Sequence, residues 1–170
     1  MAEADRPADG VYDESMWSDE NRPEGMHPYL KSKLLAERTA WDFQKALPED
    51  QKFEIVTINP GFVMGPPLRK ESFTSGGFTK RLMEGGMAEI SADHFAAVDV
   101  RDVAQAHLLG IKNPKAANKR FLLVNANFTY QEYAAPIIAK YRPLGWPITE
   151  KMGAPNPDEY VQKYNNHASK

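Results

Sequence analysis

A short, almost continuously apolar run, Phe53–Ile58, sets the strongest limit on how this chain can fold. The run is rich in β-branched residues and stops at Asn59-Pro60-Gly61. A strand without regular polar alternation is typical of a sheet that is covered on both faces. A helical pattern over residues 29–47 precedes it, and a second one over 99–111 follows later. Strands that alternate with helices in this way predict an α/β fold with a parallel sheet.

Four shorter elements complete the predicted order. They are a helix over 76–84, a strand over 95–98, a strand over 121–124 and a helix over 129–141. The last helix has the clearest start, because Thr129 and Glu132 have the spacing of a capping box. Pro136 lies inside it and counts against an unbroken helix.

Proline and glycine positions divide the chain into three segments. Residues 1–28 contain five prolines and glycines, which break helices and strands, among acidic residues. We expect irregular surface chain there. Residues 29–150 hold all the predicted helices and strands. Residues 151–170 are polar and are expected to form a tail.

Composition excludes several classes of function. The chain has 170 residues, a net charge of −2 and no cysteine, so it carries neither a basic surface for nucleic acid nor a thiolate metal site. No apolar stretch is long enough to cross a membrane. The four histidines show no ligand spacing, and we expect no metal site. These features predict a soluble, cytoplasmic protein that binds neither nucleic acid nor membrane.

The helix predicted over 29–47 places a tyrosine and a lysine on one apolar stripe. Tyr29 and Lys33 are four residues apart and therefore lie within reach of each other. The same stripe continues through Ala36, Ala40, Phe43 and Leu47. We expect this stripe to be packed, and a lysine on a packed stripe needs a partner or a use.

An ammonium group close to a phenol stabilises the phenolate and makes the hydroxyl a better proton donor. Such a donor suits the protonation of an alkoxide that forms when hydride is delivered to a carbonyl. The pair has a second interpretation, in which Tyr29 is a packing aromatic and Lys33 extends to the helix edge.

Four segments of the sequence decide between these interpretations. Val11–Asp19 (VYDESMWSD), Tyr29–Glu37 (YLKSKLLAE), Ile58–Pro66 (INPGFVMGP) and Val98–Ala104 (VDVRDVA) occur in this order. Together they resemble the extended short-chain dehydrogenase/reductases, in the branch of dihydroflavonol and cinnamoyl-CoA reductases. The resemblance covers about residues 11–141.

The resemblance implies a fold and a reaction. Residues 29–150 are expected to form the C-terminal portion of a Rossmann-type doubly wound parallel sheet with a small substrate lobe. The implied reaction is the reduction of a ketone or aldehyde, a small-molecule carbonyl substrate, by NADP or NAD. In this family the tyrosine is the proton donor and the lysine assists it and binds the nicotinamide ribose, which assigns Tyr29 and Lys33.

The resemblance also implies positions that bind the cofactor. The main chain of Pro60, Gly61, Phe62 and Val63 is expected along the nicotinamide, where glycine permits close approach. Ser75 is a weaker candidate near the diphosphate, and the segment around Phe73 is expected in the substrate lobe.

The sequence lacks a glycine-rich turn for pyrophosphate, such as G-x-x-G-x-x-G. We therefore expect the N-terminal dinucleotide-binding half to be absent and the chain to be weakly active or inactive alone. The alternative function is a non-catalytic form that docks on a full-length relative. Helix 29–47, apolar on two sides, would serve that role or self-association.

Overall fold

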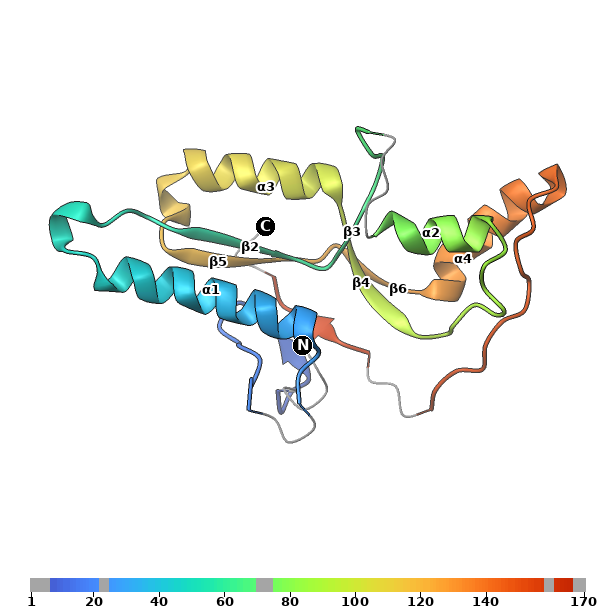
Figure 1. Ribbon diagram of the computed structural model, residues 1–170, viewed down its shortest axis with the longest axis horizontal. Coiled ribbons are helices and arrows are strands. Elements are labelled where there is room, and N and C mark those ends of the chain that lie inside the picture. The colour runs from blue at the N-terminus through green and yellow to red at the C-terminus, as the bar shows by residue number, and fades with distance from the viewer. Residues whose placement is uncertain (1–6, 22–24, 70–74, 158–160, 167–170) are drawn as a thin grey trace. The chain divides into compact units, whose positions relative to one another are not determined.

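The computed structural model describes residues 7–21, 25–69, 75–157 and 161–166 (Figure 1). The fold is α/β, as the sequence predicts, and it divides into two compact units. The first unit comprises residues 1–59, 105–122 and 162–170, and the second comprises residues 60–104 and 123–161. Each unit is described by itself below.

Strands β2 and β5 form the sheet of the first unit, with a helix on each face (Figure 1). Its elements are α1 (Pro28–Ala46), η2 (Glu49–Gln51), β2 (Val56–Pro60) except its last residue, most of α3 (Val100–Lys112), η3 (Pro114–Ala116) and β5 (Lys119–Leu123) except its last residue. Thr57 of β2 faces α1, because its hydroxyl donates to the Glu37 carboxylate at 2.8 Å. Val56 points to the other face, where its methyl group lies 3.1 Å from the position that a Cβ on Gly110 of α3 would occupy.

A second, very short parallel pair lies in the first unit. Strand β1 (Val11–Tyr12) pairs with β7 (Lys163–Tyr164). Tyr12 is fully buried, and its ring centroid lies 6.0 Å from that of Tyr164. Residues near the two ends of the sequence therefore belong to one packed unit.

The second unit contains a mixed three-stranded sheet in the order β3-β4-β6. Its elements are β3 (Phe62–Met64), α2 (Gly76–Met83), β4 (His94–Asp99), β6 (Ala126–Thr129), α4 (Tyr130–Tyr141) and η4 (Arg142–Leu144). Strands β3 and β4 are parallel, with Val63 opposite Val98, and β6 runs antiparallel to β4. The core contains Leu82, Ile90, Ala134 and Ile148.

Local sequence signals explain how several helices begin. The capping box at α4 is confirmed, because the Thr129 side chain accepts from the Glu132 backbone N–H and the Glu132 carboxylate accepts from the Thr129 N–H. The Asp99 carboxylate accepts from the Arg101 N–H at 2.8 Å where α3 begins. Pro136 does not interrupt α4.

The bounds and number of the strands differ more from the sequence prediction than those of the helices do. The run expected as a strand over 53–58 pairs only from Val56 onward. Strands β3 and β6 are three and four residues long and have no separate signal in the sequence. In the parts of the chain that the structure describes, no helix combines the length and apolar character needed to cross a membrane.

Candidate active site on helix α1

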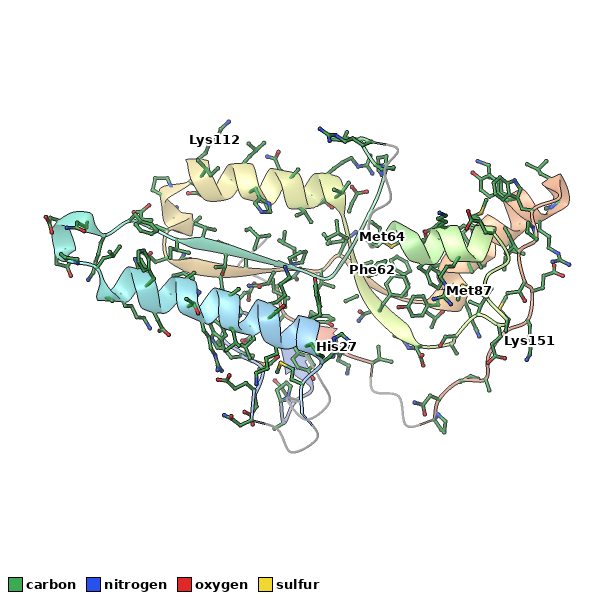
Figure 2. The ribbon with its side chains drawn as sticks, in the orientation of Figure 1. His27, Phe62, Met64, Met87, Lys112 and Lys151 are labelled. Carbon is green, nitrogen blue, oxygen red and sulfur yellow. The ribbon has the colours of Figure 1, made fainter. Side chains whose placement is uncertain are left out.

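The start of α1 fixes the position of the predicted proton donor. His27 is the N-cap residue, and its Nδ1 accepts from the Tyr29 N–H at 3.3 Å (Figure 2). Pro28 occupies the first helical position, where its missing N–H costs nothing. Lys33 follows one turn later, and its Nζ lies 5.5 Å from the centroid of the Tyr29 ring. The predicted proximity of the two side chains is therefore present.

The expected packing of their stripe is wrong. Tyr29 is 61% exposed and Phe43 is 59% exposed, and Lys33 is exposed as well. The inner face of α1 is a neighbouring stripe that contains Leu34 and Glu37. The apolar content of the helix does not reveal its orientation, because the inner face includes a carboxylate whose partners come from distant parts of the chain.

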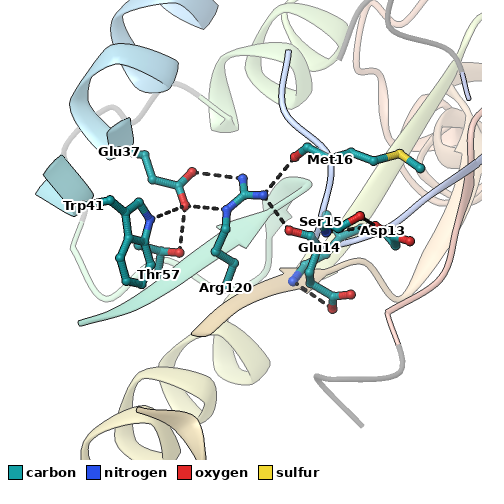
Figure 3. Close-up of polar contacts among 9 residues, drawn as sticks. Asp13, Glu14, Ser15, Met16, Glu37, Trp41, Thr57 and Arg120 are labelled. Carbon is teal, nitrogen blue, oxygen red and sulfur yellow. Dashed lines mark hydrogen bonds and ion pairs between the residues drawn. The ribbon is translucent and has the colours of Figure 1, made fainter. Parts of the chain in front are cut away.

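Glu37 is the centre of a polar network inside the first unit (Figure 3). Arg120 donates to its carboxylate from Nε at 2.7 Å and from Nη2 at 3.2 Å. Thr57 donates at 2.8 Å and the Trp41 indole at 3.3 Å. Burial acts to raise the pKa of Glu37, but the hydrogen bonds from Arg120 and Thr57 outweigh it and hold the pKa below its ordinary value.

Arg120 also anchors the segment that precedes α1. Its Nη1 donates to the carbonyl oxygens of Glu14 and Met16, the latter at 2.8 Å (Figure 3). Its guanidinium lies 3.8 Å from the centroid of the Trp17 ring. The Glu14 carboxylate accepts from the Leu122 N–H at 3.3 Å. The VYDESMWSD segment thus has a structural role, because it fastens the outer edge of β5 to α1.

The pairing of Glu37 with Arg120 is not evident from the sequence. The two residues are 83 positions apart, and neither belongs to a local pattern that indicates the other. The available signal was two aromatic residues, Tyr12 and Trp17, in a segment otherwise expected to be irregular.

The turn between β2 and β3 contains the predicted cofactor-binding residues of the second unit. The Gly61 N–H donates to the Leu123 carbonyl at 3.0 Å. A Cβ on Gly61 would lie 2.6 Å from the Ala96 carbonyl oxygen, so glycine is required there for packing alone. Phe62 packs edge-on against Phe95, with centroids 5.6 Å apart, and Pro60 is exposed.

Ser75 immediately precedes α2 and is half-buried, and its side chain makes no capping hydrogen bond. Phe73 lies outside the described residues. The structure brings Tyr29 and Lys33 together in the first unit, and Pro60, Gly61, Phe62, Val63 and Ser75 belong to the second. Among the described residues, no group of three or more histidine, aspartate or glutamate side chains could hold a metal ion.

Comparison with known proteins identifies the family. No family model matches the chain. Cinnamoyl-CoA reductase 1 of Arabidopsis thaliana is 30% identical over 167 residues, which are 97% of this chain and 46% of that protein. The NADPH-dependent methylglyoxal reductase GRE2 of Saccharomyces cerevisiae is 32% identical over 113 residues, which are 63% of this chain and 33% of that protein. The crystal structure of Gre2 from Candida albicans matches with a TM-score of 0.75 and 30% identity, over 99% of this chain and 54% of that one.

The chain belongs to the short-chain dehydrogenase/reductases. Within this family its relatives are the cinnamoyl-CoA reductase and Gre2 type of reductase, which confirms the resemblance seen in the sequence. The chain spans less than half the length of either curated short-chain reductase above. The matched Gre2 fold is consistent with a partial Rossmann-type sheet in the two units described here.

Proposed function

We propose that this chain carries the proton donor of a nicotinamide-dependent reductase that converts a ketone or aldehyde to an alcohol. The observation that carries the proposal is the Tyr29–Lys33 pair, one helical turn apart on an exposed face of α1. Its relatives support the class of reaction, since they include a methylglyoxal reductase and cinnamoyl-CoA reductases.

The two side chains have the chemistry that the nicotinamide end of the cofactor requires. Among the described residues, neither the Tyr29 hydroxyl nor the Lys33 ammonium is engaged by a carboxylate or by another hydrogen-bonding side chain. Lys33 therefore has N–H donors available for the ribose hydroxyls, and Tyr29 has its O–H available for the substrate. The residues of this chain suit only the nicotinamide end of the cofactor, because the sequence contains no glycine-rich turn to bind the pyrophosphate.

The bound cofactor supplies a hydride to the carbonyl carbon. Tyr29 donates its phenolic proton to the carbonyl oxygen, where negative charge develops. The ammonium of Lys33 lies close enough to stabilise the phenolate that remains. The proposal further assigns the main chain of Pro60, Gly61, Phe62 and Val63 to the nicotinamide, and Ser75 to the vicinity of the diphosphate. The cofactor is NADPH or NADH, and the NADPH-dependent relative favours NADPH.

A chimera tests the proposal. Residues 11–170 are joined to the part of Candida albicans Gre2 that this chain does not match, because that protein forms a complex with NADPH. We expect the chimera to oxidise NADPH when methylglyoxal is added. Tyr29→Phe should lower kcat by about 10²–10⁴, the usual contribution of a general acid, and leave the NADPH dissociation constant nearly unchanged. Tyr133→Phe, whose hydroxyl contacts Thr79 instead, is the matched control. An active chimera that keeps its rate after Tyr29→Phe would refute the assignment.

A further inference from the structure

The first N–H of α1 that needs a partner belongs to Tyr29, and a histidine supplies that partner. Pro28, at the first helical position, has no N–H. The Tyr29 N–H donates to Nδ1 of His27 at 3.3 Å (Figure 2). Helices more commonly use a side-chain oxygen of serine, threonine, aspartate or asparagine as this cap. The helix that carries the candidate proton donor therefore begins with a cap that can gain a proton.

Only the neutral imidazole of His27 can act as this cap. Nδ1 accepts through its lone pair, which requires the ring proton to be on Nε2. A protonated imidazole has an N–H at both nitrogens and cannot accept from the Tyr29 N–H. Its charge also faces the positive end of the helix dipole. His27 is exposed, and histidine side chains ordinarily gain a proton at about pH 6.5. We therefore expect the cap to be lost in mildly acidic solution.

The charged groups near the start of α1 do not compensate for a proton on His27. The first turn of the helix has no acidic residue, and the nearest charged residues along it are Lys31 and Lys33. In the segment before the helix, Asp19 accepts from a backbone N–H and Glu20 pairs with an arginine. Among the described residues, no carboxylate pairs with His27. The protonated ring would thus stand among positive charges only.

We propose that His27 is a positioning residue for Tyr29 and that its effect on Tyr29 depends on pH. The neutral ring fixes the Tyr29 N–H, while the Ser32 hydroxyl donates to the Tyr29 carbonyl at 2.7 Å. Loss of the cap releases the first of these two contacts at the frayed end of a helix. Lys33 lies one turn further inside α1, so the phenol would shift relative to the ammonium. The inference rests on the proposed function, in which Tyr29 is the proton donor.

The pH dependence of kcat in the chimera tests the inference. His27→Asn keeps a side-chain acceptor that does not titrate, and His27→Ala has none. At about pH 7.5 we expect His27→Asn to match the unchanged chimera. At about pH 5.5 it should be about threefold to tenfold faster, the factor that corresponds to one helix cap. His27→Ala should show this loss already at the higher pH. The NADPH dissociation constant should change less than about twofold, because Lys33 keeps its place.

A matched control is His107→Asn, which replaces an exposed histidine of α3. The ratio of its kcat to that of the unchanged chimera should be the same at both pH values. Parallel pH profiles of kcat in His27→Asn and the unchanged chimera would overturn the inference. The same holds if His27→Ala is as fast as the unchanged chimera at the higher pH.

A measurement without substrate or cofactor separates this inference from the proposed function. In the full chain, the Cα chemical shifts of Tyr29 and Leu30 should move from helical toward random-coil values as the pH falls. In His27→Asn they should stay helical. Shifts that stay helical in the unchanged chain would contradict the inference. A chimera that keeps its rate after Tyr29→Phe refutes the proton donor and the inference with it. Parallel pH profiles in a chimera that Tyr29→Phe inactivates refute the role of His27 alone.

Discussion

Glu37 of α1 and Arg120 of β5 form a two-pronged ion pair, with Nε 2.7 Å and Nη2 3.2 Å from the carboxylate oxygens. Their side chains are only 13% and 19% exposed. Glu37 lies on the inner face of the helix whose exposed face carries Tyr29 and Lys33. The pair thus holds the candidate proton donor in a fixed orientation relative to the sheet of the first unit.

Removing the arginine should destabilise the first unit strongly. In Arg120→Met the largely buried Glu37 carboxylate keeps only Thr57 and Trp41 as donors. The segment before α1 loses the hydrogen bonds from Arg120 to the carbonyl oxygens of Glu14 and Met16. We expect the free energy of unfolding to fall by about 3 kcal/mol, as for other broken buried pairs. Urea denaturation followed by circular dichroism measures it. Lys52→Met, which breaks an exposed pair with Glu49, should cost less than about 0.5 kcal/mol. Equal losses of unfolding free energy in the two variants would show that the Glu37–Arg120 network stabilises the fold no more than an exposed ion pair does.

The same network predicts that the stability of the folded chain depends on pH. The pKa of Glu37 in the folded chain lies below its ordinary value of 4.5. The folded state therefore favours the ionised carboxylate, and this contribution to stability is present above about pH 4.5. It is lost as the pH falls through the lower, folded-state pKa. Glu37→Gln should remove this part of the acid sensitivity, so its melting temperature should change less between pH 6 and pH 3. A variant with an unchanged acid profile would contradict the prediction.

Two lysines on α1 should behave differently in the active chimera. Lys33 lies beside the Tyr29 ring, whereas Lys31 is exposed elsewhere on the helix. Lys33→Met should lower kcat/KM by about tenfold to a hundredfold, the equivalent of one lost charge-assisted hydrogen bond, and should weaken NADPH binding. Lys31→Met should change both quantities less than about twofold. Steady-state kinetics and a fluorescence titration with NADPH measure them. Equal effects of Lys33→Met and Lys31→Met would show that Lys33 has no special part in the reaction.

Replacing glycine by alanine should have opposite effects on stability at two positions of the second unit. Gly61→Ala would bring a Cβ to 2.6 Å from the backbone oxygen of Ala96, so we expect a loss of about 1–3 kcal/mol. Gly77→Ala lies in α2 with nothing within 4 Å and should stabilise by about 0.5–1 kcal/mol. Thermal unfolding of the two variants measures these changes in stability. A neutral Gly61→Ala would show that the turn has more room than its contacts indicate.

Helices were predicted more closely than strands, for a physical reason. The spacing of Thr129 and Glu132 and the breaker at Pro48 act within a few residues of the helix that they delimit. Strand ends depend on a partner elsewhere in the chain. Residues 53–55 have strand-forming side chains, yet the strand begins only at Val56.

The candidate site was predicted in its residues but not in its orientation. The four-residue spacing placed Lys33 beside Tyr29, which is a property of the helix alone. Which face of α1 turns inward depends on Arg120, and that contact joins residues far apart in the sequence. Gly61 was assigned to close approach by a cofactor, whereas the nearest neighbour of its missing Cβ is the Ala96 backbone.

The pairing of β1 with β7 has a consequence for the synthesis of the protein. Val11 and Lys163 are about 150 residues apart in sequence, yet they are partners in one parallel ladder. Contacts of such high sequence separation form late, because a long loop must close first. At ordinary translation speeds roughly ten to thirty seconds pass between the emergence of Val11 and that of Lys163 from the ribosome. During that interval Tyr12 has no Tyr164 against which to pack. A nascent chain would therefore expose this buried ring to chaperones until Tyr164 has emerged.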